Sequence, residues 1–490
     1  MRLTRRLLLT GALAGLAWPV RADGPVTSLR PQARPVPQPP PRLADLLDAA
    51  ELSGELGLIV VDATTGRVIE ARGSGRLMAP ASTAKTITAL YALATLGPDY
   101  RFRTRLIGTG PVVDGTLQGD LILAGGGDPV LSTDHLAGMA RSLRDGGVRS
   151  IAGAFRLWAG ALPQLFQIDP DQQVHLGYNP AIGGLNLNFN RVHFGWEPAG
   201  GGDWRVTMDA RTELYVPAVT MARMRIVDRD LPIYTYAAQG DTDRWTVARS
   251  ALVEAGSRWL PVRHPAAYAA EVFAIMAAAQ GIRLGQAQPL EVLPAGTMLV
   301  SHASDRLETL IRDMLEFSTN LTAEVLGLTA SLARGGQPQT LADSAAMMDI
   351  WAAERLGARI GFVDHSGLGD GSRATPAQMV GALVVAHAGG QLPGLLKTIT
   401  LLDAQGDALP DPPATVLAKT GTLNFVSTLA GYVRRPGGGD LAFAIYAADP
   451  ARRAQAKAAA VEVPDGARPW NRRARALQQV VLQRWATLDD

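Results

Sequence analysis

The chain has 490 residues, of which 47% are hydrophobic and 19% charged, and its formal net charge is +2. This length exceeds the size at which one hydrophobic core stops growing and predicts two or three domains, while the hydrophobic content excludes a disordered chain. The nearly balanced charge indicates no basic stripe, so nucleic acid is not expected as a partner.

Residues 1–22 are typical of an export signal, with a basic start, an apolar stretch over residues 7–20 and small residues at its end. Thr4, Arg5 and Arg6 before three leucines resemble a twin-arginine signal, and an ordinary secretory signal is the alternative. The apolar stretch is short and interrupted by glycine, so no stable membrane span is expected after signal removal. We therefore expect a protein of the periplasm or cell envelope. The chain contains no cysteine and uses no disulfides there.

The next segments are a predicted linker and a predicted hairpin. Residues 23–42 are rich in proline, which is typical of an extended linker. Residues 54–73 contain two β-rich runs separated by Ala-Thr-Thr-Gly, a pattern that predicts a β-hairpin.

Ser82 and Lys85 begin a predicted helix that is apolar nearly all round and should be buried. Their spacing of three places both side chains on one face of the helix. A serine after a proline is also an ordinary helix N-cap, which would need no chemistry. Lysine occurs only as Lys85, Lys397, Lys419 and Lys457. Because lysine, unlike arginine, can be neutralised by burial, its use here favours a base beside a nucleophile.

Residues 100–288 have a different texture, with short strand-like runs between glycine turns. The glycines at 125–127 lack the Gly-Lys-Ser/Thr ending of a phosphate-binding loop and are interpreted as a turn. Helical patterns dominate residues 264–281 and 305–357, and residues 414–448 add further strands before a final helix.

The hairpin at residues 54–73 and the strands within residues 414–448 complete one sheet only if the β-rich middle is an insertion. We therefore predict an α+β fold. Residues 43–99 and 289–490 would form a main domain of helices around an antiparallel sheet, and residues 100–288 an inserted β-rich part.

Two further short motifs follow the insertion. Ser318 and Asn320 lie at the break between two helical runs, a weak signal because both residue types also cap helices. Lys419, Thr420 and Gly421 lie on a predicted strand. Glycine weakens a strand interior unless something must approach its backbone closely, so this motif is more informative.

In chain order the motifs are Ser-x-x-Lys, Ser-x-Asn and Lys-Thr-Gly, the set of penicillin-binding proteins and serine β-lactamases. From about residue 43 onward the chain resembles the class C low-molecular-mass penicillin-binding proteins, the D-alanyl-D-alanine carboxypeptidase/endopeptidase family of peptidoglycan metabolism. Residues 119–129, 185–192 and 364–376 also resemble stretches typical of that family. The resemblance implies a β-lactamase/transpeptidase-like main domain with a large insertion between the first two motifs. Thr319 stands where the family commonly has Asp.

The resemblance implies roles in proton transfer for five residues. Ser82 is expected to attack the carbonyl between two D-alanines, with neutral Lys85 taking its proton. Burial and the neighbouring cation of Lys419 are expected to lower the pKa of Lys85. Ser318 would relay a proton to the leaving D-alanine, and Asn320 would orient Lys85 and the substrate amide.

The same resemblance implies the substrate contacts. Lys419 and Thr420 would hold the terminal carboxylate, with Gly421 completing the motif beside them. The backbone N–H groups of Ser82 and Thr422 would form the oxyanion hole. The expected partners are peptidoglycan stem peptides as substrates and β-lactams as inhibitors.

Other polar residues give weaker signals. The seven histidines are scattered along the sequence without an H-E-x-x-H motif or a close pair, so neither a metal nor a cofactor is expected, and His365 is interpreted as local structure. Asp169 and Asp171 would suit a cationic group of the stem peptide, but a solvated turn is the favoured interpretation.

The expected activity is that of a carboxypeptidase that also acts as an endopeptidase. Two alternatives stay open: a serine β-lactamase and a non-catalytic protein. One common type of β-lactamase places Glu three residues before a Leu-Asn pair; here Ile182, Gly184 and Thr420 occupy those positions. A non-catalytic peptidoglycan-binding or penicillin-sensing protein would not need Ser82 and Lys85 together.

Overall fold

The structure is a computed structural model that describes residues 41–403, 405–459 and 462–488. The predicted signal at residues 1–22 and the predicted linker as far as residue 40 lie outside the described residues.

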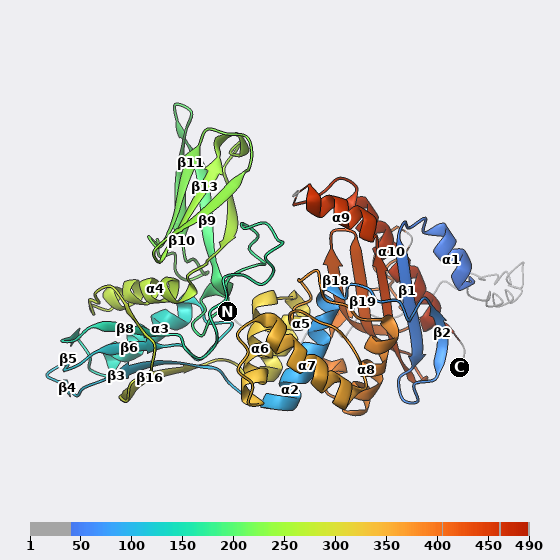
Figure 1. Ribbon diagram of the computed structural model, residues 1–490, viewed down its shortest axis with the longest axis horizontal. Coiled ribbons are helices and arrows are strands. Elements are labelled where there is room, and N and C mark those ends of the chain that lie inside the picture. The colour runs from blue at the N-terminus through green and yellow to red at the C-terminus, as the bar shows by residue number, and fades with distance from the viewer. Residues whose placement is uncertain (1–40, 404, 460–461, 489–490) are drawn as a thin grey trace, which may run out of the picture. The chain divides into compact units, whose positions relative to one another are not determined.

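A six-stranded antiparallel sheet combines strands from both ends of the described chain (Figure 1). In sheet order its strands are β17 (Lys397–Ile399), β18 (Thr415–Leu423), β19 (Val426–Arg434), β20 (Asp440–Ala448), β1 (Glu55–Asp62) and β2 (Val68–Arg72). β1 pairs with β20 along its whole length, from Glu55 opposite Ala448 to Asp62 opposite Leu441. The predicted hairpin is therefore present, and early and late segments share one sheet.

Helices cover both faces of this sheet, so β1 is an almost continuous apolar run. Because successive side chains point to opposite faces, Ile59 and Val61 belong to one core and Leu58 and Val60 to another. The first core is shared with α2 (Ala84–Leu96), α5 (Leu307–Phe317), α6 (Asn320–Ala333), α7 (Leu341–Leu356) and α8 (Pro376–Ala388). The second face carries α10 (Ala467–Ala486), against which α1 (Leu43–Ala49) packs (Figure 1).

Between α2 and α5 the chain forms four further sheets, all within described residues. The largest has the order β15 (Gln288–Leu290), β8 (Phe155–Trp158), β6 (Leu121–Ala124), β3 (Arg103–Gly108) and β16 (Thr297–Ala303). It is a mixed sheet, because β6 is parallel to β8 but antiparallel to β3. The helices α3 (Thr133–Asp145) and α4 (Pro265–Ala279) contribute to its core.

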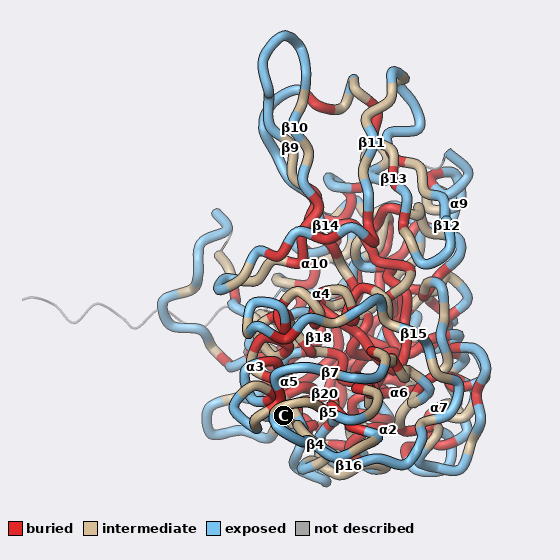
Figure 2. The backbone as a smooth tube through the Cα atoms, turned by 90° about the vertical axis from the view of Figure 1, so that its left-hand side faces the viewer, coloured by how far each residue is buried: buried red, intermediate tan, exposed pale blue. Residues whose placement is uncertain are grey.

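The other three sheets of this segment have three strands each. One contains β10 (Asp203–Asp209), β9 (Arg191–Gly200) and β14 (Gly256–Pro261); a second contains β11 (Ala222–Val227), β13 (Thr242–Ala248) and β12 (Tyr234–Gln239). The third contains β4 (Val112–Val113), β5 (Thr116–Leu117) and β7 (Ser150–Ile151). The short 3-10 turns η2 (Asn188–Asn190), η3 (Arg249–Ala251) and η4 (Pro393–Leu395) connect elements. Figure 2 shows the turn between β9 and β10 as exposed, whereas β18 and β20 run through the buried interior.

Two features of this segment differ from the sequence-based picture. Helix α3 was not expected, although Ser132 accepts a hydrogen bond from the backbone of His135 in a capping box and the buried Leu136 and Leu143 mark an apolar stripe. Strand β16 pairs with β3, so this sheet extends beyond the boundary predicted at residue 289. The division into domains stays a prediction.

Candidate active site

Ser82 lies in η1 (Ala81–Thr83), a 3-10 turn that leads directly into α2. The carbonyl of Pro80 fixes this turn, because it accepts hydrogen bonds from Thr83 Oγ1 at 2.6 Å and from Thr428 Oγ1 on β19 at 2.8 Å. Ala81 has φ 46°, a left-handed conformation that is uncommon for a residue with a side chain. The N-cap of α2 is Thr83, so Ser82 is not the ordinary helix cap that its sequence context allowed.

Gly421 lets the nucleophile turn lie against β18. A Cβ atom at this position would collide with Thr428 Oγ1 and approach the backbone nitrogen of Ser82 to 2.9 Å. The third motif therefore has glycine where the backbone of the first motif needs the space.

Lys85, on the first turn of α2, is fully buried. Its Nζ donates hydrogen bonds to Ser82 Oγ at 3.0 Å, Asn320 Oδ1 at 2.7 Å and the carbonyl of Ser366 at 2.8 Å. Burial disfavours the ammonium and lowers the pKa of Lys85 to about 8, although two buried carboxylates oppose this shift. With this pKa, roughly a tenth of Lys85 is neutral at pH 7, enough to serve as a base.

The second and third motifs meet beside this pair. Ser318 joins α5 to α6 in a left-handed conformation, φ 60° and ψ 36°, and accepts a 2.9 Å hydrogen bond from Lys419 Nζ. Lys419 is 1% exposed and also donates to the carbonyl of Thr420 at 2.7 Å. Asn320 uses its amide nitrogen to donate to the carbonyl of Tyr178 at 2.9 Å. The five residues predicted for proton transfer thus form one cluster.

The charge of Lys85 acts on the other motif lysine, Lys419. Burial, and then the charge of Lys85, holds the pKa of Lys419 well below its usual range. Burial lowers the pKa of Lys85 as predicted, but the predicted contribution of the Lys419 cation needs correction, because the charges that act on Lys85 are those of Glu324 and Asp364.

A cavity of about 360 Å³ opens over the cluster, and Ser82, Ser318, Asn320 and Thr422 form part of its wall. Lys85, Lys419 and Gly421 are buried, whereas Thr420 and Thr422 are exposed at the end of β18. Thr319, the N-cap of α6, makes no capping hydrogen bond with its side chain.

Several residues of the site were not found by sequence reasoning. Tyr178, Arg453 and Glu462 also line the cavity, and nothing in their local sequence indicates this. Glu324 and Asp364 are buried carboxylates that raise the pKa of Lys85. A glutamate inside the otherwise apolar run of α6 was the available signal for the first of them.

The weaker candidates have structural partners. Asp169 is buried and closes a turn, accepting from the backbone of Asp171 at 3.0 Å and from Gln172 Nε2 at 2.9 Å. Asp171 does meet a cation, but it is Lys457 of the same chain, at 2.9 Å. His365 is buried against Ser344 Oγ at 2.8 Å, and burial lowers its pKa to about 3, in agreement with a local structural role.

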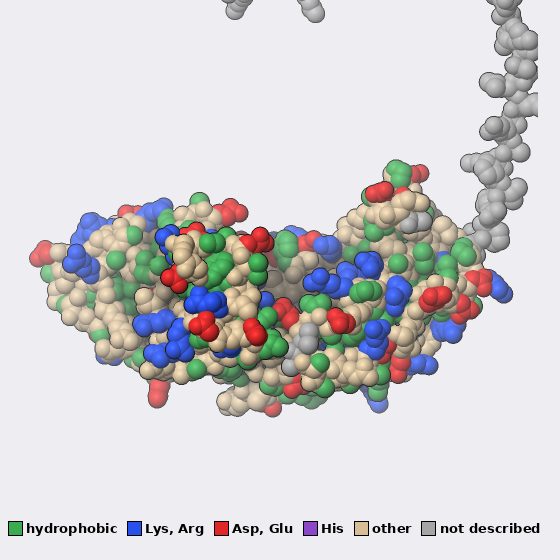
Figure 3. Space-filling model, turned by 90° about the horizontal axis from the view of Figure 1, so that it is seen from above, with side chains coloured by type: hydrophobic (Ala, Val, Ile, Leu, Met, Phe, Trp, Pro, Cys, Tyr) green, Lys and Arg blue, Asp and Glu red, His purple; other side chains and the backbone are tan. Residues whose placement is uncertain are grey.

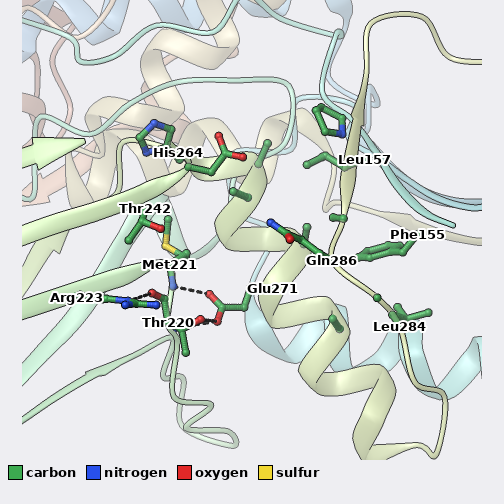
Figure 4. A pocket seen from close by; sticks show the side chains of 18 of the residues that line it. Phe155, Leu157, Thr220, Met221, Arg223, Thr242, His264, Glu271, Leu284 and Gln286 are labelled. Atoms are coloured by element: carbon green, nitrogen blue, oxygen red, sulfur yellow. Dashed lines mark hydrogen bonds between the residues drawn. The ribbon is translucent and has the colours of Figure 1, made fainter. Parts of the chain in front are cut away.

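A second cavity, of about 520 Å³, lies between α4 and the strands of the inserted segment (Figure 4). Its most prominent carboxylate, Glu271, accepts hydrogen bonds from both the backbone and the hydroxyl of Thr220 and from the backbone of Met221. The cavity wall contains none of the predicted site residues.

Three further observations concern surface charge, metal-ligating groups and membrane-spanning helices. On the face seen in Figure 3, Lys and Arg side chains are interspersed with Asp and Glu. No group of three or more His, Cys, Asp or Glu residues that could hold a metal ion occurs among the described residues. Within the same residues, every helix is too short or too polar to span a membrane.

The model of the D-Ala-D-Ala carboxypeptidase 3 (S13) family matches residues 41–465. The chain belongs to this family. The S13 assignment confirms the sequence-based resemblance and the enzyme class, a serine-type D-Ala-D-Ala carboxypeptidase.

Three known proteins or structures are similar to this chain over most of their length. A D-alanyl-D-alanine carboxypeptidase of Actinomadura sp. (strain R39) is 28% identical, covering 82% of this chain and 79% of the relative. The carboxypeptidase DacB of Haemophilus influenzae is 24% identical, covering 82% of this chain and 87% of the relative. The crystal structure of penicillin binding protein 4 (dacB) from Haemophilus influenzae superposes with a TM-score of 0.69 at 21% identity, covering 83% and 93% of the two chains. This likeness confirms the predicted α+β fold with its β-rich insertion.

Proposed function

We propose that this S13 carboxypeptidase removes the terminal D-alanine from peptidoglycan stem peptides through an acyl-enzyme on Ser82, in the periplasm or cell envelope. One observation carries the proposal: a fully buried lysine, Lys85, donates at once to Ser82 Oγ and to Asn320 Oδ1. Similarity over most of their length to proteins named D-alanyl-D-alanine carboxypeptidase supports the substrate class.

The first half of the reaction is acylation. Ser82 Oγ attacks the carbonyl of the penultimate D-alanine while its proton passes to neutral Lys85, 3.0 Å away. The negative charge that develops on the carbonyl oxygen is stabilised by the backbone N–H groups of Ser82 and Thr422. The C–N bond then breaks, and the departing D-alanine nitrogen receives, through Ser318, the proton that Lys85 took from Ser82, so Lys85 is neutral again. During acylation, Lys419 holds the substrate carboxylate through a charge-assisted contact.

The second half is hydrolysis of the ester on Ser82. After D-alanine leaves, a water molecule attacks the ester carbonyl and gives its proton to Lys85. Ser82 then leaves with a proton from the same lysine.

β-Lactams present an amide carbonyl to the same Ser82, so they acylate the enzyme. Because no glutamate precedes a Leu-Asn pair by three residues, the penicilloyl ester should persist.

The test uses purified protein with a fluorescent penicillin and a synthetic stem pentapeptide. Wild type should be labelled covalently and release D-alanine, and Ser82→Ala should do neither. Equal labelling of Ser82→Ala would show that another residue is the nucleophile. Rapid, repeated hydrolysis of nitrocefin would favour a β-lactamase, and labelling without D-alanine release would favour a penicillin sensor. We propose an endopeptidase activity on peptide cross-links as well, which cleavage of a cross-linked stem-peptide dimer would measure.

A further inference from the structure

Glu324 is a buried carboxylate behind the active-site lysine that the proposed reaction does not use. It lies in α6, on the turn after Asn320, and is 0% exposed. Each of its carboxylate oxygens accepts one backbone N–H group, Oε2 from His365 and Oε1 from Ser366, both at 2.9 Å. Both oxygens of the carboxyl group thus act as acceptors for this pair of N–H donors.

These hydrogen bonds hold the segment that contacts the base. The carbonyl of Ser366 accepts the 2.8 Å hydrogen bond from Lys85 Nζ. One residue, Ser366, therefore gives its N–H to Glu324 and its carbonyl to Lys85. Any movement of the segment that Glu324 holds would move the third acceptor of the ammonium.

The segment is fixed from its other end as well. Asp364 accepts from the backbone N–H groups of Gly367 at 2.7 Å and Gly369 at 2.5 Å. Gly367 has φ 74°, and a Cβ there would collide with the carbonyl oxygen of Ala81 in the nucleophile turn. A Cβ at Gly327 of α6 would collide with the ring of His365. The loop is thus closely packed against both α6 and the turn that carries Ser82.

Charged groups around Lys85 come from several elements. Glu324 and Asp364 raise its pKa against the effect of burial. Burial in turn raises the pKa of Glu324 to about 8, an effect that Asp364 increases and that the hydrogen bonds from Ser366 and His365 and the charge of Lys85 oppose. His365 is neutral because burial lowers its pKa to about 3. Lys419 is the neighbouring cation, and its own pKa is lowered by burial and by Lys85.

We propose that Glu324 is a positioning residue that holds the Ser366 carbonyl against Lys85 and opposes loss of the Lys85 proton. Through these two effects it sets both the place of the base and the pH range over which the base is neutral. The proposal rests on the proposed role of Lys85 in acylation. Glu324 itself does not touch the reacting atoms.

Replacement by the amide changes both effects at once. Glu324→Gln removes the carboxylate whose charge raises the pKa of Lys85, so this pKa should fall below about 8. The amide oxygen can accept only one of the two N–H groups, and its NH₂ group faces the other. The maximal acylation rate should therefore fall roughly tenfold to a hundredfold, because a displaced base is a poor one.

Two further variants provide a rescue and a matched control. Glu324→Asp keeps the charge but shortens the side chain, so the Lys85 titration should stay close to wild type while the maximal acylation rate falls. Asp349→Asn alters another inward-facing carboxylate, which accepts from the backbone of Phe362 at 2.8 Å but does not contribute to the pKa of Lys85. This control should leave the titration and the acylation profile near wild type.

The decisive measurement is the pH titration of Lys85 by NMR with ¹³Cε-labelled lysine. The chain has only four lysines, and Lys85→Arg identifies the signal. A lower Lys85 pKa in Glu324→Gln alone, with the acid limb of penicillin acylation moved the same way, supports the proposal. An unchanged pKa, or an equal change in Asp349→Asn, overturns it.

Two further outcomes are a Glu324→Gln variant that does not fold and a wild-type protein without activity. If Glu324→Gln does not fold, as judged by thermal unfolding, Glu324→Asp decides: a normal acylation rate in that variant overturns the positioning role, and a reduced rate with a normal Lys85 titration supports it. The titration needs no turnover. A wild-type protein that neither binds penicillin nor releases D-alanine would remove the proposed function and still leave the electrostatic part of this test standing.

Discussion

Lys419 donates a 2.9 Å hydrogen bond to Ser318 Oγ, so the cation of the third motif and the hydroxyl of the second are in direct contact. Lys85 is bonded in the same way to Ser82 Oγ at 3.0 Å. Each serine of the site therefore has its own lysine, and the two lysines differ in surroundings. The charges of two buried carboxylates act on Lys85, whereas Lys419 donates to a hydroxyl and a carbonyl and is affected by the charge of Lys85.

The two lysines should respond differently to arginine. Lys85→Arg keeps the charge but remains protonated at any working pH, so base catalysis is lost and acylation by fluorescent penicillin should fall roughly 10² to 10⁴-fold. Lys419→Arg should be milder, because arginine still meets a carboxylate. Near-normal acylation in Lys85→Arg, or an equal collapse in both variants, would mean that the roles are assigned wrongly.

Acylation should depend on pH through the base. Only neutral Lys85 accepts the proton of Ser82, and the pKa of Lys85 is about 8, so the rate should rise with pH until about that value. Between pH 6 and pH 9 the neutral fraction grows by a factor on the order of a hundred. Stopped-flow acylation over this range measures the acid limb directly. A flat profile would contradict Lys85 as the base.

Gly421→Ala should disable the site although the change is one methyl group. The added Cβ would collide with Thr428 Oγ1 beside the nucleophile turn, so η1 must move away from β18 and acylation should fall at least tenfold. Gly381→Ala is the matched control, because this glycine of α8 has open space around its Cβ position. The control should acylate normally and gain stability of about 0.5–1 kcal/mol from better helix propensity. Equal acylation rates in the two variants would contradict the packing argument.

Glu462 should stabilise the protein in a pH-dependent way. It lies 3.2 Å from His175 Nε2 and accepts from Arg258 at 2.9 Å, and these groups lower its pKa to about 2. A lowered carboxyl pKa stabilises the fold above the unfolded value of about 4.3, and the contribution is lost as pH falls toward about 2.

The melting temperature of Glu462→Gln tests this pairing. The variant should melt below wild type at pH 7 and pH 5 by a similar margin, and the margin should shrink at pH 3. Glu354→Gln, an exposed position on α7, should show no such dependence. A margin that widens toward pH 3 would reverse the predicted sign.

The motifs and the two-part sheet could be predicted from sequence because they depend on local patterns. Ser82 and Lys85 share a face at a spacing of three, and β1 is a continuous apolar run that must be buried on both sides. Hydrogen bonds between backbone groups and distant side chains leave no such local pattern in the sequence. The carbonyl of Tyr178 reaches Asn320 across 142 positions of the chain. Glu324 acts on Lys85 through a loop 42 residues later, a relationship that spacing alone does not indicate.

The nucleophile turn depends on the last part of the chain to be made. Pro80, which fixes that turn, is held by Thr428 across 348 positions, and β1 is paired along its whole length with β20. A growing polypeptide that ends before β18 therefore carries Ser82 and Lys85 without the strands that arrange them. We therefore expect reactivity toward an acyl donor only after β18, β19 and β20 have been synthesised and have folded against the turn.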